Sequence, residues 1–293
     1  MTTFRLLVTE PLDGAANMAL DEALLTGRLR GTSPPTLRFF AWAPPAISLG
    51  YGQRLDERID LAEARRLGIG VVRRATGGSA ILHEGPGLEV TYAVTAGAGD
   101  FAGADDLLAT YRAIGAALEA GLRGLGAPAE MVAVQPSDPG AMPAFCFART
   151  GSHELEVAGR KLVGSAQRRQ GSAFLQHGSV MLGAAADRLR RVFPGEADPL
   201  RGMTTLEAVL GRRPSFDETV AALCEGFRGA PGIELAPGGL DGGEQALMAD
   251  LARDKYGAEA WTRDGVDPRA AAPGARGAAG PATRAALASG SPR

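Results

Sequence analysis

The stretch Gly159–Gln167 reads GRKLVGSAQ, and the segment Glu154–Val157 just before it reads ELEV. Both segments read as short β-strands, and the Ala158-Gly159 pair between them is typical of a tight turn. We therefore predict a hairpin here. The segment Ala173–Leu182 reads as a further strand that continues it.

The rest of the chain alternates strand and helix patterns around this hairpin. Apolar, β-prone segments predict strands at 4–8, 36–42, 46–51, 69–73, 80–83 and 88–94, the last two around a turn at Glu84–Gly87. Apolar residues at helical spacing predict helices at 15–25, 59–67 and about 104–125, and helices are expected to dominate from Leu182 to Trp261. We therefore predict an α/β or α+β fold, with a mixed β-sheet core flanked by helices.

Composition sets the domain organisation and excludes several functions. The 293 residues suit one domain over 1–264, followed by an Ala, Gly, Pro and Arg-rich tail at 265–293 that we expect to be disordered. A net charge of -2 argues against a protein that mainly binds nucleic acid. No apolar run is long enough to span a bilayer or to act as a signal peptide, which favours the cytoplasm. The two cysteines and three histidines lack metal-ligand spacing, so no metal site is predicted.

Lysine is scarce in this chain and is therefore informative. Only Lys161 and Lys255 occur among 31 basic residues, so each is expected where an ammonium does something that a guanidinium cannot. Cys146 lies fifteen residues before Lys161, between two phenylalanines. A nearby ammonium favours a thiolate, which would make Cys146 a nucleophile. A buried, inert cysteine is the alternative, and spacing alone leaves it open.

Two further elements suggest chemistry less specifically. The loop Arg73–Ser79 carries the double glycine Gly77-Gly78, where a ligand can approach the backbone closely, although an ordinary tight turn has the same pattern. His177 lies in a short strand and is either a base or a structural residue. Pairing of His83 with Glu84 is not expected, because adjacent strand side chains point to opposite faces.

Four motifs occur in a fixed order along the chain: NMALDE at Asn17–Glu22, RRATGG at Arg73–Gly78 running on to His83, GRKLVGSAQ at Gly159–Gln167, and QHGS at Gln176–Ser179. Together they resemble the family of lipoate-protein ligases, biotin-protein ligases and octanoyltransferases over residues 4–263. Within it the chain is most similar to octanoyltransferases of the LipM type, through the Cys146-Phe147 pair, the run GSAQR and the closing segment Leu251–Trp261. The implied fold is the one shared with biotin-protein ligase and class II aminoacyl-tRNA synthetase catalytic domains.

The resemblance also implies roles for individual residues. Cys146 would be the acyl-thioester nucleophile, and Lys161 would lower its pKa and hold the acyl carbonyl. The implied substrate-binding residues are Arg73, Thr76, Gly77, Gly78, His83, Gly164, Ser165, His177 and Gly178. The Thr76-Gly77-Gly78 loop and His83 would line the acyl tunnel, and Gly164, Ser165 and His177 would surround the thioester.

The resemblance implies octanoyl transfer from octanoyl-acyl carrier protein to a lysine of a lipoyl domain, most simply that of glycine cleavage H protein, without a cofactor. Three alternatives remain open: ATP-dependent lipoate ligation, amidotransfer between two lipoyl domains, and a binding module without turnover. The first would bind lipoyl-AMP, with Cys146 incidental.

Some positions depart from the family pattern. Ser79 stands where many ligases have a third glycine, the turn after His83 is longer, and His153-Glu154 stand where LipM-type proteins tend to have an aromatic residue. We expect these differences to alter the shape of the tunnel and to leave Cys146 and Lys161 unaffected.

Overall fold

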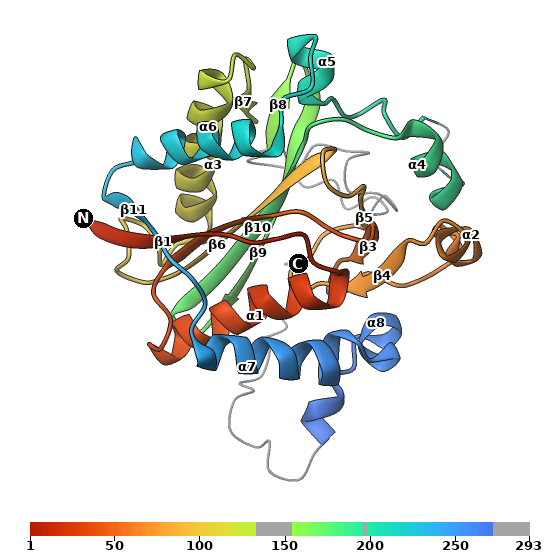
Figure 1. The fold of residues 1–293 in the computed structure, drawn as a ribbon, viewed down its shortest axis with the longest axis horizontal. Coiled ribbons are helices and arrows are strands. Elements are labelled where there is room, and N and C mark those ends of the chain that lie inside the picture. Colours follow the sequence, from red (N-terminus) through yellow and green to blue (C-terminus); the bar gives the residue numbers. More distant parts are fainter. Residues whose placement is uncertain (133–153, 196–197, 272–293) are drawn as a thin grey trace, which may run out of the picture.

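A mixed β-sheet forms the centre of the molecule (Figure 1). The computed structural model describes residues 1–132, 154–195 and 198–271. Within them the large sheet has the strand order β11 (Ile233–Pro237), β1 (Thr2–Val8), β2 (Thr36–Phe40), β6 (Glu89–Gly97), β10 (Ala173–Met181), β9 (Arg160–Gln170), β8 (Leu155–Val157) and β7 (Glu130–Met131). The expected mixed sheet is confirmed.

The hairpin predicted from the GRKLVGSAQ stretch is present. Strands β8 and β9 pair antiparallel, and β9 pairs antiparallel with β10 from Gln170↔Ala173 to Val163↔Val180. Ala158 and Gly159 in the turn have φ values of 50° and 70°. Positive φ at both central residues is the geometry of a tight hairpin turn that matches the strand twist. This hairpin brings the sequence around Lys161 next to the strand that carries His177.

Helices cover both faces of the sheet. Helices α1 (Gly14–Arg30) and α7 (Gly242–Leu251) lie side by side on one face, and α3 (Leu107–Gly124) and α6 (Phe216–Arg228) pack together on the other (Figure 1). Helix α1 begins where the side chain of Asp13 accepts from the backbone N–H of Ala16, and it ends at Gly31, whose φ is 73°. It runs five residues past the expected end at Leu25. Gly27 stays within the helix and packs closely against Ser33, and the residue that terminates the helix is Gly31.

A second, smaller sheet lies beside the large one and has the order β4 (Gly70–Arg73), β3 (Ala46–Leu49), β5 (Ile81–His83). Helices α2 (Leu61–Arg66) and α4 (Ala186–Val192) pack on it around their own apolar cluster. The turn at Glu84–Gly87 therefore separates strands that belong to different sheets: β5 pairs with β3, whereas β6 pairs with β2 and β10. The junction of the two sheets is the place where the motifs meet.

Helices dominate after β10, as expected, and the strand β11 interrupts them. The segment IELAP pairs parallel with β1 at the edge of the large sheet, from Thr2↔Ile233 to Leu6↔Pro237. Five residues ending in proline carry no strand periodicity of their own, and the partner strand lies over 200 residues away in the sequence. The helices α5 (Leu206–Leu210) and α8 (Glu259–Asp264), the π-helical turn η2 (Ala252–Tyr256) and the 3-10 turn η3 (Pro268–Ala271) complete this part.

The boundary expected at residue 264 falls inside a structured region. Lys255 is buried, and its Nζ lies 2.7 Å from Glu22 Oε2 and 3.6 Å from Asp267 Oδ2. Arg269 forms an ion pair with Asp267 at 2.7 Å. The segment 265–271 thus packs against the domain. Over the stretches that the structure describes, no helix combines the length and apolarity needed to cross a bilayer.

Candidate functional site

A narrow cavity lies where the two sheets and α1 meet. Its volume is about 40 Å³, on the order of one water molecule. The described residues that line it are Met18, Trp42, Ser48, Arg74, Gly78, Ile81, His83, Thr91, Gly164, Ser165, Ala166, His177, Gly178 and Ser179. All four sequence motifs supply wall residues. The first motif supplies Met18, and the other three supply residues of the glycine loop, β9 and β10. The cavity is therefore the point on which these distant motifs converge.

One wall of the cavity is a buried chain of polar groups around His83. Ser48 Oγ lies 2.9 Å from His83 Nε2, and Glu89 Oε1 lies 2.9 Å from His83 Nδ1. Trp42 stacks on the imidazole with ring centroids 3.7 Å apart, and its Nε1–H donates to Thr91 Oγ1. Strand β5 carries His83 and β6 carries Glu89, so the chain joins the two sheets. The carboxylate that pairs with His83 is Glu89 and not the adjacent Glu84, as the alternation of strand side chains requires.

A second chain of buried, hydrogen-bonded polar groups surrounds His177. Thr76 Oγ1 lies 2.6 Å from His177 Nε2, and Asp21 Oδ2 lies 2.9 Å from His177 Nδ1. The other oxygen of Asp21 accepts from Arg38 at 2.7 Å, and Arg38 also donates to Asn17 Oδ1. Burial lowers the pKa of His177 from 6.5, against the opposing effect of the Asp21 carboxylate. The Asn17–Glu22 motif thus places its carboxylate behind a histidine of the cavity.

Arg74 connects these two chains. Its Nε–H donates to Thr76 Oγ1 at 3.2 Å, and its Nη1 donates to the hydroxyl and the carbonyl of Ser48 at 3.2 and 2.9 Å. Its Nη2 donates to the carbonyls of Gly77 and Ser79. One guanidinium therefore holds the glycine loop and both hydroxyls in place.

Arg73 is an expected substrate-binding residue, but its side chain is not among the described residues that line the cavity. The Arg73 guanidinium donates to the backbone carbonyls of Gly50, Tyr51, Gln53, Trp261, Thr262 and Arg263. Burial lowers its pKa, although it stays a cation in the arginine range. Because Trp261–Arg263 lie in the last turn of α8, their carbonyls present a partial negative charge to it. Arg73 fastens the C-terminal helix to β4, and its neighbour Arg74 faces the cavity.

The glycines of the motifs are required where backbones approach closely. A Cβ on Gly178 would lie 2.3 Å from the carbonyl oxygen of Gly164 and 2.8 Å from the Tyr92 ring. Tyr92 Oη lies 2.7 Å from Ser165 Oγ, and burial raises the pKa of Tyr92 to about 12, so it remains a neutral partner. Gly164, Ser165 and Gly178 form one continuous wall across β9 and β10.

Lys161 lies at the start of β9, buried, with its Nζ 2.5 Å from Glu154 Oε1. Its backbone is clamped, since its N–H donates to Gly202 and its carbonyl accepts from Thr204. The expectation that the His153-Glu154 departure leaves Lys161 unaffected is wrong, because Glu154 is its ion-pair partner. Lys161 is not among the wall residues of the cavity. Cys146 lies outside the described residues, whereas the other cysteine, Cys224, is buried in α6.

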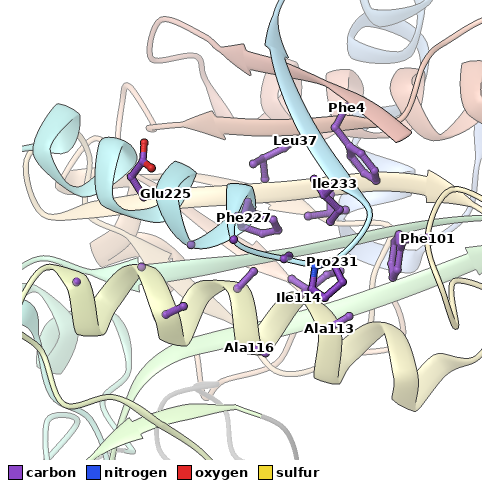
Figure 2. Close-up of a pocket in the computed structure, with 18 of the residues that line it drawn as sticks. Phe4, Leu37, Phe101, Ala113, Ile114, Ala116, Glu225, Phe227, Pro231 and Ile233 are labelled. Carbon is purple, nitrogen blue, oxygen red and sulfur yellow. The ribbon is translucent and has the colours of Figure 1, made fainter. Parts of the chain in front are cut away.

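A larger cavity of about 600 Å³ lies between α3 and α6 (Figure 2). Phe4, Phe101, Ile114 and Phe227 project into it, and Glu225 is the single ionisable side chain among its described lining residues. The helices come close through glycine: a Cβ on Gly226 would lie 2.1 Å from the carbonyl oxygen of Ala117. Because Glu225 is the single ionisable group in its described wall and none of the four motifs contributes to that wall, this cavity is not the candidate reaction site.

The cavity brings together Gly78, His83, Gly164, Ser165, His177 and Gly178 of the expected substrate-binding residues, and Thr76 and Gly77 contact Arg74 just behind it. Sequence reasoning missed the supporting residues Asp21, Ser48, Arg74, Glu89 and Glu154. Asp21 and Glu89 had a usable signal, a single carboxylate within an otherwise uncharged buried helix face or strand.

The geometry agrees with comparisons to known proteins. Residues 13–228 match the model of the lipoyl protein ligase A/B catalytic domain. The chain belongs to this family.

Individual relatives are similar to this chain over most of its length. The chain is 41% identical to "Octanoyltransferase LipM" of Moorella thermoacetica, over 89% of this chain and 98% of that protein. It is 38% identical to "Octanoyltransferase LipM" of Symbiobacterium thermophilum with the same shares. Among solved structures, the putative lipoate protein ligase Ta0514 of T. acidophilum has a TM-score of 0.72 at 25% identity, covering 90% of this chain and 99% of that one. The expected lipoate-ligase type of fold is thereby confirmed.

Proposed function

We propose that this protein is an octanoyltransferase of lipoate biosynthesis that forms an octanoyl thioester on Cys146. The observation that carries the proposal is the convergence of the family motifs on one narrow cavity whose described wall is mostly uncharged. A saturated acyl chain fits such a wall, because it offers no group for a buried charge to pair with. The LipM relatives support octanoyl as the transferred group.

Binding of an eight-carbon chain requires the walls to open, because about 40 Å³ is too small for it. Met18 is an unbranched side chain that adapts its rotamer at little cost. The wall residues Gly78, His83, Gly164, Ser165, His177 and Gly178 would contact the chain and the thioester. Thr76 and Gly77 would support the loop from behind.

The reaction balances without a cofactor. The Cys146 thiolate attacks the carbonyl carbon of octanoyl-acyl carrier protein, a new C–S bond forms, and the carrier thiolate leaves and takes a proton. The lysine amine of a lipoyl domain, such as that of glycine cleavage H protein, then attacks the Cys146 thioester. An amide forms, the C–S bond breaks, and the amine proton returns to the sulfur. Splitting the transfer through a covalent intermediate is the usual logic of nucleophilic catalysis.

Lys161 would stabilise the thiolate at both steps. An adjacent ammonium lowers the pKa of a cysteine thiol. The carboxylate of Glu154 lies 2.5 Å from the Lys161 ammonium. This ion pair would hold the ammonium in place while the thiolate forms.

The test is transfer in the absence of ATP. Purified protein is mixed with octanoyl-acyl carrier protein and a lipoyl-domain acceptor, and the acceptor is weighed by mass spectrometry. Octanoylation without ATP supports the proposal. Modification that appears only with ATP and free octanoate or lipoate would make the protein a ligase, and modification only from an already octanoylated lipoyl domain would make it an amidotransferase.

A further inference from the structure

Arg74 determines the direction of the hydrogen bonds that reach both histidines. A guanidinium carries five N–H donors and no acceptor. Thr76 Oγ1 and Ser48 Oγ must therefore each accept from Arg74, at 3.2 Å in both cases. Each hydroxyl then has its single proton left for its second partner, which is Nε2 of His177 or of His83.

The opposite polarity would leave a buried proton without an acceptor. If Nε2 of either histidine donated, its hydroxyl would accept twice, and the hydroxyl proton would have no partner among the described residues. Thr76 and Ser48 are each 1% exposed, so bulk solvent does not supply the missing acceptor. Such an orphan costs about 1–3 kcal/mol. The two hydroxyls therefore donate to the histidines.

The carboxylates at the far ends lead to the same assignment. Asp21 Oδ2 accepts from Nδ1 of His177, while Arg38 occupies the other Asp21 oxygen. Glu89 Oε1 accepts from Nδ1 of His83 and from Thr91, whose own oxygen accepts from Trp42. Both imidazoles thus carry their proton on Nδ1 and present a lone pair at Nε2. Each neutral ring lies between a carboxylate and a hydroxyl held by Arg74. The carboxylates are Asp21, which also pairs with Arg38, and Glu89.

We propose that Arg74 is a positioning residue that fixes His83 and His177 as neutral Nδ1–H tautomers on two sides of the cavity. Its remaining N–H groups hold the Gly77 and Ser79 carbonyls, so the glycine loop and the two rings are set by one side chain. An uncharged wall of this kind suits an acyl chain. Only the identity of the ligand in this inference rests on the proposed function. The direction of the hydrogen bonds does not depend on that function.

Imidazole nitrogen NMR tests the proposal, because the chain has three histidines. In the full-length protein labelled with ¹⁵N-histidine, we expect two of the three rings to show a protonated Nδ1 and an unprotonated Nε2 at neutral pH. Ser48→Ala should change the ring of His83 alone, and Thr76→Val that of His177 alone. Arg74→Lys should change both, because an ammonium cannot reach all the acceptors of the planar guanidinium.

Two results would overturn the proposal: Nε2–H or charged rings in the wild type, or an Arg74→Lys protein whose two rings keep their wild-type signals. If Arg74→Lys does not fold, the Ser48→Ala and Thr76→Val proteins decide, since each should move one ring and spare the other. Octanoyl transfer is assayed separately on the same samples. Correct tautomers in a protein without transferase activity would contradict the proposed function and leave the role of Arg74 intact.

Discussion

Asp21 and His177 are 156 residues apart in the sequence, yet Oδ2 of Asp21 lies 2.9 Å from Nδ1 of His177. The first comes from α1 and the second from β10 at the centre of the large sheet. This contact links the helix motif to the QHGS motif, because the helix supplies the carboxylate that orients the histidine.

Replacing Asp21 by Asn should destabilise the fold strongly. The amide removes the charge that pairs with Arg38, whose one acidic partner among the described residues is Asp21. Arg38 is fully buried and stacks on Phe40 at 3.8 Å. Breaking one side of a buried pair costs about 3–5 kcal/mol. Urea unfolding measures the loss. The control is Asp187→Asn, since Asp187 pairs with Arg190 at the surface with its side chain 97% exposed and should cost less than about 1 kcal/mol. Equal losses would contradict the role given to Asp21.

Stability should fall as the pH drops below about 6.5, in part through His177. Burial lowers the folded-state pKa of His177 below 6.5, so the unfolded chain binds the proton first. Stability is then complete above the unfolded pKa and is lost as pH falls toward the folded pKa, by at most about 1.4 kcal/mol per pH unit. We expect His177→Gln to be less stable at neutral pH and to show a smaller loss on acidification. Urea unfolding from about pH 8 to about pH 5 compares the two slopes, and parallel curves would contradict the prediction.

The two glycines of the loop should differ sharply. Gly78 has a φ of 91°, and a Cβ there would lie 2.9 Å from Nη2 of Arg74. Gly78→Ala should therefore cost about 1–3 kcal/mol and slow octanoyl transfer. A Cβ on Gly77 meets nothing within 4 Å, so Gly77→Ala should change the unfolding free energy by less than about 0.5 kcal/mol. Thermal unfolding and transfer rates are compared, and a Gly77 variant as damaged as the Gly78 variant would be inconsistent with this geometry.

Glu154→Gln should impair transfer beyond its effect on stability. It keeps the shape of the side chain and removes the charge that faces the Lys161 ammonium at 2.5 Å. We expect a fall of about tenfold or more, equivalent to 1.4 kcal/mol, in the rate per folded molecule. The matched control is Glu22→Gln, which removes the partner of the other lysine, Lys255; neither residue is among the described wall residues of the cavity. It should lose stability and keep its rate, whereas equal rate losses would remove the special role of Glu154.

Local signals predicted the parts of this fold that are close in sequence. The hairpin around Ala158-Gly159, helix α3 and the glycine loop depend on neighbouring residues, so their patterns were sufficient. The separation of β5 from β6 into different sheets and the pairing of β11 with β1 depend on distant partners. Such partners leave no periodicity in the segment itself.

The same distinction applies to the candidate site. The resemblance identified six of the fourteen described wall residues, but it assigned Arg73 to the substrate and gave no role to Arg74. Adjacent strand-end residues point to opposite sides, and the sequence does not reveal which side faces the cavity. The partners Asp21, Glu89 and Glu154 became visible only when the fold brought them within hydrogen-bond distance of His177, His83 and Lys161.

The most direct test of the account is the intact mass of the protein after incubation with octanoyl-acyl carrier protein and no ATP, measured beside Cys146→Ala. The account predicts one octanoyl adduct on the wild type, removed by hydroxylamine as a thioester is, and none on the variant. An unmodified wild type, or an adduct that persists in Cys146→Ala, would contradict a thioester mechanism through Cys146.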